Sequence, residues 1–341
     1  MKIMKLTGLV VTTGMITLMF LGLPTALAGE SFEQIVAGAK KEGKVVFFES
    51  QPDKAWIKLM KAFQKKYPFI KSYKHERLFG GKLNTRIITD AQAGADSADL
   101  MTTAPYAITP LHKRGLLQKV DWKGLGISPK SIYDEYSTLS SVFFYAIGYN
   151  TDLVKGADIP KGWNDMLDPK WAEKGAWWRY YQPWPLLAKS WGQTKAENYL
   201  KSLLASKLRT ARSPTTVANW VASGEAHVGI TILTRLQGAR KKGAPVAWVY
   251  PDPLPMIQLV FGVLKGAKHP NAAKLLVHWL SSPEGALMYE KISMRGNPWV
   301  KGSELGKVMA SHNTAYYSWE KMAEYKKSSA AMTAILKKAK K

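Results

Sequence analysis

Cysteine is absent from the whole sequence. Disulfide bonds, thiolate catalysis, cysteine-ligated metals and a lipid anchor on an N-terminal cysteine are therefore excluded. Internal repeats are also absent, and so are long linkers rich in glycine, serine or proline. If the chain forms two domains, short crossings must join them, because no segment has the composition of a tether.

Recognisable catalytic motifs are missing as well. The six histidines are dispersed along the chain, and neither H-E-x-x-H nor G-x-S-x-G occurs. The sequence therefore predicts a protein that is not an enzyme and that uses no cofactor or metal. The alternative from another functional class is a secreted hydrolase whose site has no recognised motif.

Acidic residues are few, with 25 Asp and Glu against 49 Lys and Arg and a formal net charge of +24. The lysines are scattered along the chain, and the densest run lies at the end, at residues 337–341. This distribution favours a solvated basic surface over a nucleic-acid partner. A basic surface also raises the association rate of an anionic ligand or favours docking on an anionic membrane.

The N-terminus has the pattern of a signal peptide. Lys2 and Lys5 precede an apolar run over residues 8–24, which ends in Ala26-Leu27-Ala28. Thr12 and Thr13 weaken the alternative of a retained membrane helix. We therefore expect residues 1–28 to be removed and the mature protein to be periplasmic.

Strand and helix patterns alternate through the mature chain. Residues 44–48 read as a short buried strand, and Trp56, Leu59, Met60 and Phe63 then recur at helical spacing until Pro68. Further strands are predicted at residues 70–77, 98–101, 143–149, 175–178, 227–231 and 246–249. The fold class is therefore α/β with parallel strands, and ligands are expected in the loops at the carboxyl ends of the strands.

Short segments along the chain have the order and spacing of a known family. They are Lys41-Glu42-Gly43-Lys44-Val45-Val46, residues 62–68, Ser97-Ala98-Asp99-Leu100, Gly115-Leu116-Leu117, Gly148-Tyr149-Asn150-Thr151, residues 163–171 from Trp163 to Trp171, Ser223-Gly224-Glu225, residues 242–246, 270–274 and Ser282-Pro283-Glu284-Gly285. Over nearly the whole mature chain the sequence resembles the iron-binding-like branch of family 1 extracellular solute-binding proteins of ABC importers. Most of these residues are turn and helix-end residues that identify a scaffold.

The resemblance implies a two-lobed periplasmic-binding fold of type II, in which each lobe is a central sheet flanked by helices. Lobe one would hold residues 29–142 and 255–300, and lobe two residues 143–254 and 301–341, with crossings near Phe143 and Pro253. A small molecule would bind between the lobes, whose hinge motion closes the cleft. The implied protein partner is the membrane permease of an ABC importer.

The sequence departs from the ferric-iron binders of this family at one informative place. Those proteins carry adjacent tyrosines just after the Gly-Glu strand, whereas this chain has Thr234-Arg235. A fixed cation there would repel Fe(III), while a guanidinium can hold a carboxylate or phosphate through two parallel hydrogen bonds. The alternative is that Arg235 shares the polar face of a helix with Arg240 and Lys241.

Other candidate ligand contacts follow predicted strands. In lobe two, Arg212 and Ser213 precede a helix that begins near Pro214, where they form either an anion site or an ordinary cap. The aromatic block at residues 177–184 adds Trp178, Arg179 and Tyr181, although such rings are often core. In lobe one the candidates are Ser50, Gln51, Arg77, Thr102 and Thr103.

Together these residues predict capture of a small organic anion by arginine and hydroxyl donors with ring stacking. An aromatic carboxylate, a phosphonate or a sugar phosphate would fit. The alternatives within the same class are ferric iron or a metal complex, or a neutral polyol.

Overall fold

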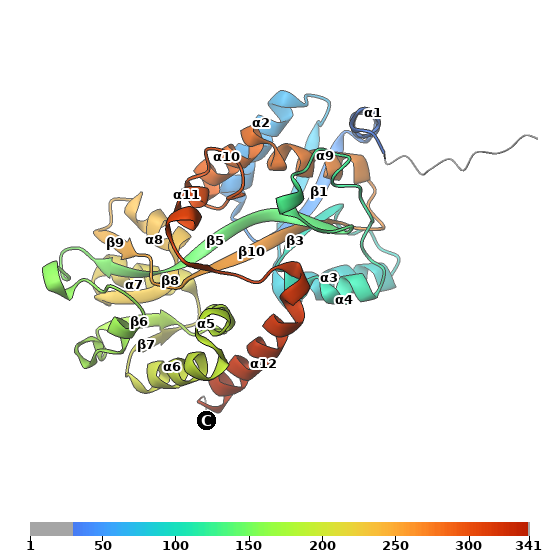
Figure 1. The fold of residues 1–341 in the computed structure, drawn as a ribbon. Coiled ribbons are helices and arrows are strands. Elements are labelled where there is room, and N and C mark those ends of the chain that lie inside the picture. Colours follow the sequence, from blue (N-terminus) through green and yellow to red (C-terminus); the bar gives the residue numbers. More distant parts are fainter. Residues whose placement is uncertain (1–29, 340–341) are drawn as a thin grey trace, which may run out of the picture.

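The computed structural model describes residues 30–339, and these form two lobes that share one sheet (Figure 1). The strand order is β2-β1-β3-β10-β5-β8-β6-β7, and β4, β9 and β11 pair with strands along this path. The predicted signal peptide lies outside the described residues. Within residues 30–339, no helix combines the length and apolar character that crossing a bilayer requires.

Lobe one comprises the β2-β1-β3 end of the sheet and the helices around it. Its first elements are α1 (Phe32–Glu42), β1 (Lys44–Glu49), α2 (Asp53–Lys66), β2 (Ser72–Arg77), α3 (Gly80–Gln92), β3 (Leu100–Thr103), α4 (Thr109–Lys113) and β4 (Ile132–Asp134). Later in the chain, α9 (Pro270–Ser281) and α10 (Pro283–Ser293) return to this lobe, where α9 packs on α1 and α10 on α2.

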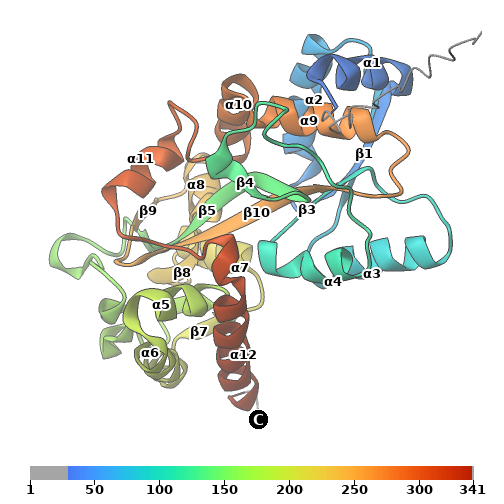
Figure 2. The same cartoon turned by 45° about the vertical axis from the view of Figure 1, so that its right-hand side comes forward.

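Lobe two comprises the β8-β6-β7 end of the sheet. Its elements are β6 (Gly175–Trp178), α5 (Pro183–Trp191), α6 (Gln193–Ala205), β7 (Arg209–Ala211), α7 (Pro214–Ser223), β8 (Val228–Ile232), α8 (Leu233–Arg240) and β9 (Val246–Val249). Near the C-terminus, the start of α11 (Glu304–Ser311) is hydrogen-bonded to Glu290 of the lobe-one helix α10, β11 (Thr314–Ala315) pairs with β10, and α12 (Met322–Lys338) ends the described chain. Helix α12 packs beside α5 and α6 (Figure 2).

Two long antiparallel strands, β5 (Ser137–Asn150) and β10 (Leu254–Val263), connect the lobes. Strand β5 pairs with β10 from Thr138 to Phe144 and with β8 from Tyr145 to Tyr149, so its partner changes between Phe144 and Tyr145. The other side of β10 pairs with β3. The prediction of parallel strands holds for β2-β1-β3 and β8-β6-β7 but is wrong for β5 and β9, because β5 runs antiparallel to β8, β9 and β10.

The first helices form where the sequence places their signals. Helix α1 begins at a capping box in which Ser31 and Gln34 bond each other's backbone, and it ends at Gly43, whose φ of 62° is left-handed. In α2 the predicted stripe of Trp56, Leu59 and Phe63 is fully buried. These contacts fix α2 on the sheet and place its N-terminus at the end of β1.

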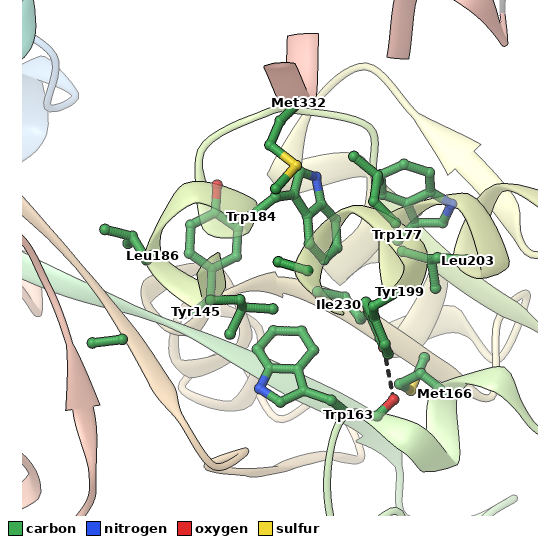
Figure 3. Packing of buried hydrophobic residues seen from close by; sticks show 14 of the residues in the cluster. Tyr145, Trp163, Met166, Trp177, Trp184, Leu186, Tyr199, Leu203, Ile230 and Met332 are labelled. Atoms are coloured by element: carbon green, nitrogen blue, oxygen red, sulfur yellow. Dashed lines mark hydrogen bonds between the residues drawn. The ribbon is translucent and has the colours of Figure 1, made fainter. Parts of the chain in front are cut away.

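The core of lobe two is built from aromatic rings (Figure 3). Trp177 and Trp184 meet edge to face with centroids 5.7 Å apart, and the Tyr199 hydroxyl donates to the Trp163 carbonyl at 2.7 Å. Met332 of α12 packs against the same cluster. Trp177 and Trp184 from the aromatic block are thus core residues, as alternation along a strand leads one to expect.

Candidate ligand-binding cleft

The loops after β1 and β2 lie opposite the start of α8, and a cleft of about 780 Å³ opens between the two lobes beside them. Lobe one contributes Gln51 and the first turns of α2, and lobe two contributes α7, Thr234 and Arg235 of α8. Helices α7 and α8 lie close to the sheet because Gly148 and Gly229 are paired there without side chains. A Cβ at Gly148 would meet Leu236 at 2.3 Å.

Three arginines from separate segments converge at the inner end of this cleft. The pKa of Arg235 is lowered to about 10, first by burial and then by the positive charges of Arg295 and Arg77. Arg295 is only 5% exposed. Its guanidinium donates to Ser50 Oγ at 3.0 Å and lies 4.6 Å from the centre of the Phe143 ring. Such proximity of like charges favours an anion between them.

The buried carboxylate of Glu49 lies at the end of β1, next to Ser50. It accepts hydrogen bonds from the Ser50 hydroxyl at 3.1 Å, from Trp56 Nε1 at 3.1 Å and from the Gln51 backbone N–H. Arg77 Nε donates to the Ser50 carbonyl at 3.1 Å. The loop after β1 is therefore fixed by its own hydrogen bonds, and Ser50 and Arg77 are held beside Arg295.

Several donors at the cleft keep a buried polar atom without a hydrogen-bond partner among residues 30–339. They are Gln51 Nε2, Thr234 Oγ1 and the Nε atoms of Arg235 and Arg295, whereas Thr103 Oγ1, at the end of β3, lacks a partner there too but does not line the cleft. Buried polar groups are ordinarily paired, so these donors are suited to a ligand. Thr102 is the neighbour of Thr103 in β3, and its side chain points to the opposite face of the sheet.

A second group of candidates lies in an aromatic cluster. Trp178 lies between two nearly parallel rings, Tyr145 at 6.0 Å and Tyr180 at 4.5 Å between centroids. Tyr181 meets Tyr106 of lobe one edge to face at 6.2 Å. Burial is the largest cause that raises the pKa of each of these four tyrosines, so the phenols are neutral donors and acceptors. The cluster joins the two lobes.

The remaining predicted residues have structural contacts or none. Arg179 donates through Nη2 to the Leu336 carbonyl of α12 at 2.8 Å. Ser213 caps α7 by accepting from the Thr215 N–H at 3.1 Å. Arg212 is exposed, and its side chain has no ion pair or hydrogen bond within the described part of the chain. None of the three is among the residues that gather around Arg235.

Sequence reasoning missed Arg295, Tyr145 and Tyr106. Arg295 follows α10, a helix with no feature that marks a ligand site, and it reaches Ser50 across 245 residues of sequence. No local pattern could have found it. Tyr145 lies within the strand predicted at residues 143–149, and only the structure shows that its ring stacks on Trp178.

The comparisons with known proteins agree on the scaffold. The family model for bacterial extracellular solute-binding proteins matches residues 49–287. An uncharacterised protein of Haemophilus influenzae is 25% identical over 284 residues, which cover 78% of this chain and 80% of that protein.

Two solved structures show the same fold. Iron-bound HitA from Pseudomonas aeruginosa is 19% identical with a TM-score of 0.70, covering 86% of this chain and 99% of HitA. AfuA from Actinobacillus pleuropneumoniae, solved with fructose-6-phosphate, is 23% identical with a TM-score of 0.69, covering 86% of this chain and 98% of AfuA. The two-lobed type II fold predicted from the sequence is confirmed. The chain therefore belongs to the family of bacterial extracellular solute-binding proteins.

Proposed function

We propose that the protein binds a small organic anion in the periplasm, between its two lobes, and delivers it to the membrane permease of an ABC importer. The observation that carries this proposal is the convergence of Arg77, Arg235 and Arg295 with unpartnered hydroxyl and amide donors from both lobes. Guanidinium groups and neutral donors together suit a carboxylate, a phosphonate or a phosphate monoester.

The alternatives fit these residues less well. Fe(III) prefers ionised phenolates, whereas burial raises the pKa of the clustered tyrosines and keeps them neutral. A neutral polyol would leave the charges of three neighbouring arginines uncompensated. A ligand whose own negative charge lies among the guanidinium groups compensates them.

A thermal-shift screen of the purified protein against organic anions, neutral sugars and ferric salts tests this proposal, because a ligand that binds only the folded state stabilises it. We expect anions to raise the melting temperature. Arg235→Ala should weaken their binding by about 10- to 100-fold, in line with about 1.5–3 kcal/mol for hydrogen bonds to a charged group. Stabilisation by ferric salts or neutral sugars alone would contradict the proposal.

Arg240→Ala provides the matched control. Arg240 lies at the other end of the same helix, is exposed, and its guanidinium lies 5.4 Å from the centre of the Trp248 ring. The Arg240→Ala substitution removes one positive charge, as Arg235→Ala does, but Arg240 does not line the cleft. Anion binding should survive this change, so a similar loss in both variants would show that net charge alone is responsible.

A further inference from the structure

The outer part of the cleft is lined by cations from both lobes. Lys54 and Lys58 reach it from α2, and Lys241 and Lys242 reach it from the turn after α8. None of the residues that line this cleft is Asp or Glu. The nearby carboxylate of Asp53 is bonded to His75 at 2.8 Å.

These four lysines are unpaired. In the part of the chain that the structure describes, none of their ammonium groups forms a salt bridge, a hydrogen bond or a contact with an aromatic ring. Two lie on one lobe and two on the other, so closure of the cleft brings like charges together. Their repulsion opposes closure until negative charge is placed between them.

Apart from its cations, the cleft is lined mostly by small and apolar side chains. Ala55, Ala218, Ala222 and Gly238 leave space there, and Ile57 is 55% exposed at the edge. A carboxylate or phosphate bound by the arginines would occupy only the inner end of a cleft of about 780 Å³. The outer part has the size and polarity for a spacer that leads to a second charged group.

From this arrangement we infer that the ligand carries two separated anionic groups. One binds at Arg77, Arg235 and Arg295, and the other binds at the lysines of the outer cleft. The chemical class is an anion such as a bisphosphate or a phosphorylated carboxylic acid. This inference rests on the proposed function and specifies its ligand.

Matched pairs of probes test the inference. Fructose 6-phosphate is compared with fructose 1,6-bisphosphate, and glycerol 3-phosphate with 3-phosphoglycerate, by calorimetric titration at low and at physiological salt. The second anionic group should strengthen binding by about tenfold at low salt and by less at high salt, because exposed charge pairs are weak and screened. The gain should vanish in a variant with Lys54, Lys58, Lys241 and Lys242 changed to Gln.

The control variant carries Lys195→Gln and Lys201→Gln on α6, where both residues are exposed in lobe two and lie outside the cleft lining. It should keep the gain. If probes with one anionic group bind through Arg235 but the second group adds nothing, or the four-lysine variant keeps the gain, the inference is wrong and the proposed function stands. If no anion binds, both are wrong.

Discussion

At the scale of single residues, the cleft shows how a loop can hold cations close together. Glu49 is buried with three donors directed at its carboxylate, and Ser50 is bonded by both Arg295 and Arg77. Glu49 fixes the Ser50 loop through these hydrogen bonds, and the loop in turn bonds two of the three arginines. The pKa of Arg235 is lowered first by burial and then by the positive charges of Arg295 and Arg77, so a negatively charged group is favoured among them.

The tyrosines provide a test at this scale. Burial raises the pKa of Tyr106, Tyr145 and Tyr325 well above 10.0. Above about pH 10 the unfolded chain therefore releases protons that the native protein keeps, and stability should fall as the pH rises beyond that value. Absorbance of tyrosinate and circular dichroism, followed together against pH, should show these phenols ionising only as the fold is lost.

The same titration bears on the iron alternative. With neutral phenols, added ferric citrate should give no visible tyrosinate-to-iron absorption band at neutral pH. If all the tyrosines ionised near pH 10 while the circular dichroism stayed unchanged, the conclusion that burial keeps Tyr106, Tyr145 and Tyr325 neutral would be wrong.

At the scale of helices and strands, sequence patterns predicted what is locally encoded. Residues 53–67 gave α2 because Trp56, Leu59, Met60 and Phe63 recur at the helical period, and residues 246–249 are β9 as expected. Strand β10 was not predicted, although it lies at the centre of the sheet. Its residues are buried without alternation, so the sequence carries no period that indicates a strand or its direction.

In the candidate site, too, some residues could be nominated from the sequence, whereas others are brought there only by tertiary packing. Thr234 and Arg235 were nominated because they stand where the ferric-iron binders of the family carry adjacent tyrosines. Ser50 and Gln51 were nominated because they follow a predicted strand, and Arg77 because it ends one. Arg295 could not be nominated, because its place at the site depends on the packing of α10 against α2. Arg179 is the opposite case. It was nominated because it follows β6, but its side chain bonds the Leu336 carbonyl of α12.

Arg179 gives a prediction about α12. Its guanidinium bonds the Leu336 carbonyl in the last turn of that helix, where carbonyls have no partner within the helix. Arg179→Ala should lower the free energy of unfolding by about 1–3 kcal/mol and increase hydrogen exchange near the C-terminus. Anion affinity should change less than in Arg235→Ala, and a larger loss of affinity would instead place Arg179 at the ligand.

At the scale of the whole molecule, β5 and β10 are adjacent in one sheet, and the chain passes between the lobes along them. Tyr106 of lobe one accepts a hydrogen bond from Gln182 of lobe two at 2.8 Å, and Lys326 of α12 donates to Thr109 at 2.9 Å. The lobes are thus in contact beside the aromatic cluster as well as at the two strands. Motion between them is expected to bend these strands and to separate these side-chain contacts.

The passage of the chain along β5 and back along β10 also decides the order in which the protein can fold. Lobe two is largely continuous in sequence, whereas lobe one needs β10 between β3 and β5, and Glu42 must bond the backbone of Ala272. Pulsed hydrogen exchange during refolding should protect β6 and β8 before β1 and β3, because long-range pairings form slowly. Earlier protection of β1 and β3 would contradict this order.

During synthesis the first half of the chain therefore emerges without the strand that completes its sheet. It remains unable to reach its final structure until residue 263 and the helix beyond it have been made. A nascent chain that matures so late stays extended for longer, and this delay is compatible with passage through a narrow export channel before folding.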